Sequence, residues 1–180
     1  MDRVEELIRL FESEKLSEDP AAEYPERIRI IEELEEIQDP RVISFFVDVV
    51  LNKDEYDLAR IEILRILRVR APKEDEYGVI GRALIRVLIE DTDNLVKNYA
   101  AMALSSYMNT PGALDVVKEI VLDVDADRNL RYSAFGALED AGVGRFTTDV
   151  MRELLKDDEM QDSAESVPTN GAFPSKTDLN

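Results

Sequence analysis

The sequence of 180 residues contains no cysteine and no histidine. Disulfides, thiolate chemistry, Cys/His zinc sites and every mechanism that needs an imidazole base are therefore excluded. No apolar run in the sequence approaches the roughly 20 residues that cross a bilayer. The amino terminus also lacks the basic stretch and apolar core of a secretory signal. We therefore expect a cytoplasmic protein that is not an enzyme, binds no membrane and holds no metal or cofactor.

Basic residues are also scarce. The chain has 22 Lys and Arg against 40 Asp and Glu, which gives a formal net charge of −18. Such a chain repels nucleic acid and anionic membranes over most of its surface and attracts cationic partners. A basic protein partner is the natural inference, and binding of nucleic acid is not expected. A simpler interpretation is that the charge only keeps the protein soluble.

Glycine and proline are few, at seven residues each, while 44% of the residues are apolar and 34% are charged. This composition is typical of a soluble protein rich in helices. The length suits one domain with a sizeable core, or a short array of stacked repeats, and is too short for two large domains.

The chain contains an internal repeat. Four segments share a basic residue that is followed at +3 and +7 by small or aliphatic residues, and these basic residues are Arg27, Arg60, Lys97 and Arg131. They lie 33, 37 and 34 positions apart. The apolar residues of each segment have helical spacing, and a helix breaker follows each segment, at 39–40, 71–72, 110–111 and 141–142. We predict a helix at each of the four segments.

Further helical patterns lie between these segments, over residues 42–50, 79–88 and 114–121. The turn that would join each of these helices to the next basic segment is acidic, at 54–57, 90–93 and 123–127. Residues 157–159 supply an equivalent acidic turn after the last helix. The sequence therefore predicts helix pairs that alternate along the chain.

Each repeat has a first helix, an acidic turn, and a second helix with an early Arg or Lys and an Ala/Leu-rich face. This order resembles the HEAT repeat family. The resemblance covers residues 24–158 and is greatest over 94–104 and 129–138. It implies an all-α fold, a right-handed α-solenoid of about four HEAT-like helix pairs with terminal capping helices, over residues 1–160. It also implies that the early basic residue of each second helix pairs with the acidic turn of a neighbouring repeat.

The last residues, 161–180, have a different composition. They are rich in Ser, Thr, Asn and Gly, contain two prolines and have only scattered apolar residues. We predict an extended or disordered tail.

The turn at 123–127 resembles the beginning of a calcium loop, because Asp123, Asp125 and Asp127 alternate. Arg128 stands where such a loop needs glycine, and Ala134 stands where it needs a bidentate glutamate. Since the acidic turn recurs in every pair, capping of the free N–H groups of the second helix is the better explanation. We assign no catalytic residue and no metal ligand.

Two surfaces are candidates for partner binding. The resemblance implies that second helices line a concave binding face. If Val96, Ala100, Ala103, Leu104 and Tyr107 form the core side of a helix over 94–109, other residues of that helix point outward. With their counterparts in neighbouring helices, the outward residues are Glu32, Glu35, Arg65, Arg68, Asn98, Met102, Ser105, Tyr132 and Glu139. In this register Glu32 stacks beside Arg65, and Glu35 stacks beside Arg68. Tyr132 can equally well be interpreted as a residue that packs between repeats. The second candidate is the edge of acidic turns, with Asp54, Asp91, Asp93, Asp123 and Asp125.

These features lead to the hypothesis of a non-catalytic, protein-binding solenoid. Its most specific form is an acidic immunity or inhibitor protein that occludes a basic toxin such as a nuclease, as a monomer or as a heterodimer with that partner. One alternative is a general adaptor or assembly scaffold, which an apolar and salt-insensitive interface would favour. A second is a small HEAT-like lyase or glycosylase. The lack of Cys and His and the acidic surface weigh against that second alternative.

Overall fold

The structure is a computed structural model that describes residues 2–13, 26–71, 73–142 and 148–167. These ranges form ten α-helices and one 3-10 helix, η1 (Ser105–Tyr107), and contain no strand. The all-helical prediction is therefore confirmed. The α-helices are α1 (Arg3–Ser13), α2 (Glu26–Glu35), α3 (Pro40–Leu51), α4 (Asp57–Val69), α5 (Glu74–Glu90), α6 (Asn94–Leu104), α7 (Ala113–Leu122), α8 (Arg128–Asp140), α9 (Thr148–Leu154) and α10 (Gln161–Ser166).

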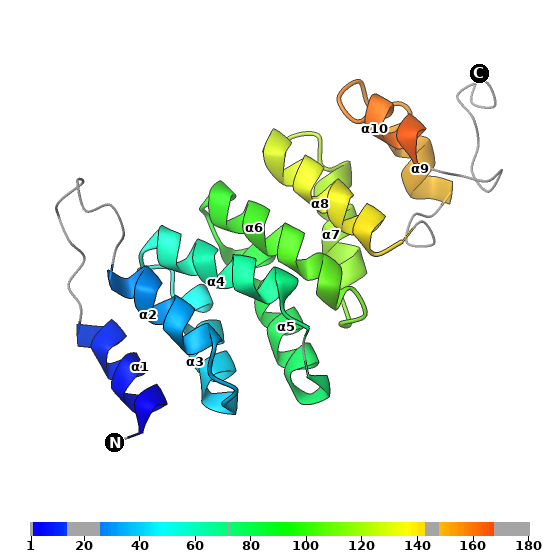
Figure 1. Cartoon of the computed structure of the whole chain (residues 1–180). Helices are drawn as coiled ribbons and strands as arrows, with labels where there is room; N and C mark the ends of the chain where they lie inside the picture. The colour runs from blue at the N-terminus through cyan, green and yellow to red at the C-terminus, as the bar shows by residue number, and fades with distance from the viewer. Residues whose placement is uncertain (1, 14–25, 72, 143–147, 168–180) are drawn as a thin grey trace.

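Each helix from α1 to α7 packs against the next helix but one. The even-numbered helices α2, α4, α6 and α8 contact one another in that order, and α1, α3, α5, α7 and α9 do the same. Contacts of α3 with α4, α5 with α6 and α7 with α8 join the two sets. Figure 1 shows the helices following one another across the molecule from the amino to the carboxyl terminus. Their apolar faces share one buried cluster that extends from Val4 to Val167.

Aspartate side chains start three of these helices. Asp39 precedes Pro40 and accepts from the N–H of Arg41 at the start of α3. Asp93 and Asp127 cap α6 and α8 by accepting from the N–H three residues later. The prediction that the acidic turns cap second helices is thus confirmed for α6 and α8. It is wrong for α4, whose N-cap residue has no side-chain hydrogen bond.

The helix that the sequence places over 94–109 is shorter in the structure, because α6 ends at Leu104 and η1 follows it. Two side chains of η1 attach it to the end of α4: Ser106 donates to the carbonyl of Arg68, and Tyr107 donates to that of Leu67 at 2.9 Å. All five residues assigned to the core side of this segment are buried. The apolar periodicity thus predicted the buried face of this segment correctly. The change from α-helix to 3-10 helix occurs where the segment contacts α4.

The predicted extended or disordered tail is wrong over residues 161–167. Residues Gln161–Ser166 form α10, which contacts α9. Met160, Ala164 and Val167 are buried in the common core. Their spacing of four and three residues is helical, so a short apolar face covers the end of the core despite the polar composition. Residues 168–180 lie outside the described ranges.

Candidate functional site

The acidic turns are built in the same way. Each begins with an Asn or Asp whose Oδ1 accepts the N–H of the residue two positions later, which is the Asx turn that these side chains favour. The donor–acceptor distances are 2.9 to 3.1 Å. The pairs are Asn52 with Asp54, Asp91 with Asp93, Asp123 with Asp125, and Asp157 with Glu159. One carboxylate oxygen of each aspartate therefore shapes the turn, and the other is available for a different partner.

The four turns lie along one side of the molecule. Because α4, α6 and α8 pack side by side, their amino-terminal ends follow one another in space, as Figure 1 shows. The first and second turns also contact each other, since Nζ of Lys53 donates to the carbonyl oxygen of Glu90. We call this side the turn edge and define it as residues 52–58, 89–95, 122–128 and 156–159.

Arg60 links three elements beneath the turn edge. Its Nε and Nη2 donate to the carbonyl oxygen of Val50, at the end of α3, at 3.1 and 2.9 Å. Nη2 also pairs with Oδ2 of Asp91, in the turn between α5 and α6. The Arg60 side chain is only 1% exposed. We call such a contact an arginine bridge, because one guanidinium joins the end of a helix to the turn of the following pair.

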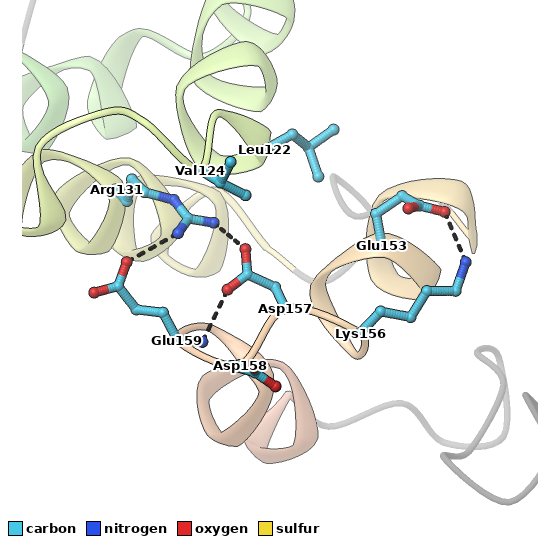
Figure 2. Close-up of a pocket in the computed structure, with 8 residues that line it drawn as sticks. All are labelled: Leu122, Val124, Arg131, Glu153, Lys156, Asp157, Asp158 and Glu159. Atoms are coloured by element: carbon cyan, nitrogen blue, oxygen red, sulfur yellow. Dashed lines mark hydrogen bonds and ion pairs between the residues drawn. The ribbon is translucent and has the colours of Figure 1, made fainter.

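Arg131 forms a second arginine bridge at the equivalent place in α8. Its Nε and Nη2 donate to the carbonyl oxygen of Val121, at the end of α7, at 3.2 and 2.9 Å. Its guanidinium also pairs with Asp157 and Glu159, between α9 and α10. Figure 2 shows the guanidinium held between these two carboxylates. The expected pairing of Arg60 and Arg131 with the turn of the next repeat is therefore confirmed.

The remaining two basic positions differ. Arg27 pairs with Glu55 in the following turn, as expected, and its guanidinium also lies 4.8 Å from the ring centroid of Phe11. Lys97 is half-buried and forms no ion pair with the described residues. The pairing predicted for Lys97 is therefore wrong. An ammonium group is a compact charge that lacks the planar fork with which arginine can serve a carbonyl and a carboxylate together.

The arginine bridges keep two carboxylates ionised. Burial alone would raise the pKa of Asp91, but hydrogen bonds from Arg60 and from the N–H of Asp93 outweigh it and hold this pKa below its ordinary value of 3.8. Burial likewise opposes ionisation of Asp157, and hydrogen bonds from Arg131 and from backbone N–H groups lower the pKa of Asp157. The charges of these bridges are thus paired within the chain.

The turn residues that the sequence assigned to partner binding fall into two groups. Asp54, Asp123 and Asp125 are exposed on the turn edge. Asp91 is buried, and Asp93 is half-buried and caps α6. The first group is accessible to a partner, whereas Asp91 and Asp93 already serve the fold.

The arginines predicted on the second-helix face have partners that the repeat register did not predict. Arg65 pairs at 2.9 Å with a glutamate three residues earlier in α4. Arg68 lies 3.9 Å from Asp140 at the end of α8. Glu32 is exposed and Glu35 is half-buried, and burial together with neighbouring carboxylates raises the pKa of Glu35. This part of the face therefore contains both signs of charge.

The three residues assigned to this face on the segment 94–109 are Asn98, Met102 and Ser105, and all are half-buried. Oδ1 of Asn98 is buried without a hydrogen-bond partner in the described part of the chain. Ser105 donates to the carbonyl oxygen of Met102 at 2.9 Å. These side chains offer a partner less surface than the sequence predicted.

Tyr132 and Glu139 complete the predicted face, on α8. The Tyr132 hydroxyl donates to the carbonyl oxygen of Glu159 at 3.0 Å, and the guanidinium of Arg128 lies 5.6 Å from the centroid of its ring. Tyr132 therefore lies in the contact between α8 and the turn after α9. Glu139 is exposed, and partial burial followed by the charge of Asp140 raises the pKa of Glu139.

An open pocket of about 490 Å³ lies at the carboxyl-terminal end of the turn edge. It is lined by Leu122, Val124, Arg131, Glu153, Lys156, Asp157, Asp158 and Glu159. Figure 2 shows that the two arginine-bound carboxylates form one paired group in it and that Glu153 and Lys156 form another. Asp158 is exposed. Arg131, Glu153 and Lys156 are thus engaged in ion pairs within the pocket.

Sequence reasoning missed part of the turn edge. It did not identify Asp158 as a candidate, and it did not identify the exposed apolar residues Leu58, Ile89, Leu95, Leu122 and Val124. In the sequence these apolar residues are next to or near the helix ends, where they look like continuations of the buried helix faces. Only the packing of the helices determines which of them stay exposed.

A comparison of the chain with models of protein families found no match, and comparisons with curated proteins and with solved structures found none either. None of the described helices is both long enough and apolar enough for a membrane span. Within the same residues, no three acidic side chains converge as a metal ion would require.

Proposed function

We propose that this chain is a HEAT-like, right-handed α-solenoid that binds a protein and does not catalyse a reaction. The contacts between alternate helices and the recurring Asx turns support the solenoid. The array would include α10, so it would extend to Val167 rather than to residue 160. In its most specific form the protein is an acidic, cytoplasmic immunity or inhibitor protein that occludes a basic toxin such as a nuclease, with one copy of each in the complex.

The observation that carries this proposal is the exposure of carboxylates on the turn edge. Arg60 and Arg131 are each 1% exposed and pair with Asp91 and Asp157. Asp54, Asp123 and Asp125 are exposed. Each buried arginine is matched by a carboxylate, so the excess of acidic residues over basic ones belongs to the rest of the chain and includes the exposed carboxylates of this edge.

A surface of this kind suits a stoichiometric inhibitor of a basic protein. Carboxylates along one edge raise the rate of encounter with a cationic partner, and like-charged proteins are rejected. A nuclease is one such partner, because its own binding site must be complementary to a polyanion. Occlusion of that site requires binding alone and no reaction by the inhibitor.

The adaptor or scaffold function is the second candidate. It is favoured by the five exposed apolar residues of the turn edge, since an apolar interface depends little on salt. The lyase or glycosylase alternative would need a nucleophile, or an acid whose pKa is raised by burial in an enclosed pocket. In the pocket of Figure 2, Arg131, Glu153 and Lys156 are paired and Asp158 is exposed, which does not favour this alternative.

Affinity capture from the native host, at low and at high salt, tests the proposal. We expect the full chain to capture a basic protein at low salt and to lose it as salt is raised. The captured protein is then purified, and its toxicity or nuclease activity is measured with and without an equimolar amount of the chain. Full inhibition at about one-to-one stoichiometry is expected.

The variant that tests the role of the turn edge combines Asp54→Asn, Asp123→Asn and Asp125→Asn, and the parent chain is its control. These side chains are exposed, and Asn keeps the oxygen that Asp123 uses in its Asx turn, so the fold should be retained. Capture of the same basic protein by this variant should weaken strongly. Capture that is equally strong with the variant, or a partner that is held at high salt, would favour the adaptor instead.

A further inference from the structure

The turn edge collects most of the exposed apolar side chains. Among the described residues, eight large apolar side chains are exposed. Five of them lie on the turn edge: Leu58, Ile89, Leu95, Leu122 and Val124. The other three are Leu10 in α1, Val69 at the end of α4, and Val79 in α5. Single exposed apolar residues are common on soluble proteins, but a group of them on one edge is typical of an interaction surface.

Exposed carboxylates alternate with these apolar residues. Asp54 lies close in sequence to Leu58, while Asp123 and Asp125 lie on either side of Val124. Ile89 and Val124 are 66% and 69% exposed. At the carboxyl-terminal end, Leu122, Val124 and Asp158 line the open pocket of Figure 2, which is about 490 Å³ in volume. The edge therefore offers acidic and apolar contacts together.

The second-helix face lacks this combination. Its predicted apolar residue, Met102, is half-buried, and Tyr132 is engaged with Glu159. Arg65 and Arg68 are exposed on the same face beside carboxylates, so charges of both signs lie close together there and attract a cationic partner less than an excess of carboxylates does. The turn edge is thus the better surface for such a partner.

We propose that the turn edge docks a basic protein surface on which apolar side chains lie between lysines or arginines. The inference rests on the proposed function, and it names the surface and the chemistry of the partner. The carboxylates bring the cationic partner to the edge and set its orientation. The apolar residues lose contact with water in the complex and slow its dissociation.

Two synthetic peptides of equal charge test this inference on the full chain. One is an oligolysine, and in the other leucines separate the same number of lysines. Binding is followed by titration of the ¹⁵N-labelled protein, which reports both the affinity and the residues affected. We expect both peptides to shift signals on the turn edge, and the leucine-containing peptide to bind at least about tenfold more tightly because it also buries apolar surface.

Three single variants remove the apolar contacts: Ile89→Ser, Leu95→Ser and Val124→Ser. Each should weaken binding of the leucine-containing peptide about three- to tenfold and leave oligolysine binding nearly unchanged. The matched control is Val69→Ser, because Val69 is 78% exposed but lies at the other end of α4. This control should not change the affinity for either peptide.

Equal affinity for the two peptides, or an equal effect of Val69→Ser and Ile89→Ser, would overturn the inference while leaving the proposed function intact. Signal shifts on the second-helix face would do the same. If neither peptide binds even at low salt, the proposed preference for a basic partner fails as well. Sedimentation of the chain alone completes the test, since a dimer that Ile89→Ser dissociates would assign the edge to a second copy and overturn the inference.

Discussion

Arg60 and Lys97 occupy the same place in neighbouring helix pairs, yet they contact their surroundings differently. Ten positions before each stands a valine of the preceding helix: Val50, one residue before the end of α3, and Val87, three residues before the end of α5. Arg60 donates to the carbonyl oxygen of Val50 and pairs with Asp91, whereas Lys97 has no ion pair in the described residues. Two residues at the same position of the repeat therefore need not make the same contacts.

The chemistry of the two side chains explains the difference. A guanidinium has five N–H donors in a planar fork, so Arg60 can serve a carbonyl and a carboxylate while it is fully buried. An ammonium group is more strongly hydrated and is not a substitute in that geometry. Arg131 repeats the Arg60 arrangement two helix pairs later.

The largest expected effect follows from breaking the Arg60 bridge. Arg60→Ala should lower the free energy of unfolding by about 3–5 kcal/mol, because it leaves the buried Asp91 carboxylate unpaired. Lys97→Ala is the matched control and should cost no more than about 1 kcal/mol. Urea unfolding followed by circular dichroism measures both values. Equal losses for the two variants would remove the distinction between the two positions.

A smaller effect is expected when arginine is replaced by lysine at the second bridge. Arg131→Lys keeps the positive charge but loses the fork that contacts Val121 and Asp157 together. We expect a loss of about 1–2 kcal/mol in the same unfolding experiment, about the value of one or two buried hydrogen bonds. An unchanged stability would mean that charge alone is sufficient at this position.

The pH dependence of stability tests the contribution of the carboxylates in the arginine bridges. The pKa of Asp91 is lowered in the folded state, so its contribution is fully present above its ordinary pKa and is lost as pH falls through the folded-state pKa. Asp91→Asn removes this titration. From about pH 5 to about pH 3 the stability of Asp91→Asn should therefore fall less, or rise more, than that of the parent chain.

This result requires the two proteins to be compared at each pH, because the other carboxylates titrate in both and their contribution cancels in the difference. Asp157→Asn should change the pH dependence in the same direction, since its pKa is lowered too. Parallel stability profiles for the parent and both variants would contradict the assignment of these carboxylates to the bridges.

The smallest expected effect is a gain of stability. Lys97→Arg supplies a fork four residues after the N-cap of α6, as Arg60 is four residues after the N-cap of α4, and the following turn begins at Asp123. The carbonyl oxygen of Val87, ten positions before residue 97, already accepts the N–H of Asp91 at 3.0 Å. We expect the midpoint of urea unfolding to rise by an amount equivalent to about 0.5–1 kcal/mol, the net value of one hydrogen bond. A loss of stability would indicate that the packing around position 97 does not admit a guanidinium.

Much of the fold could be predicted because its signals are local. Helical spacing identified the buried faces of α3 to α8, and the breakers gave their approximate ends. The acidic turns and their repetition were also visible in the sequence. The pairing of Arg60 and Arg131 with the following turn was implied by the resemblance to HEAT repeats. A short apolar face such as Met160, Ala164 and Val167 was overlooked, since three residues give a weak periodic signal against a polar composition.

The candidate site was less predictable than the fold. The sequence placed Asp54 and Asp91 in one class of acidic turn residues, but the first is exposed and the second is buried with Arg60. The sequence also did not show that Ile89 is exposed while its neighbour Leu88 is buried. Exposure at a helix end depends on which neighbouring element covers it.

The sequence by itself determined the class of secondary structure, the repeat, the acidic turns and the excess of negative charge, because each depends on residues within a few turns of one another or on composition. Only the tertiary structure decided which carboxylates are paired inside the molecule and which remain outside. The arginine and the carboxylate of a bridge are separated by 26 to 31 positions in the chain. Their contact is set by the packing of whole helices, and the same packing leaves acidic and apolar side chains together on one edge.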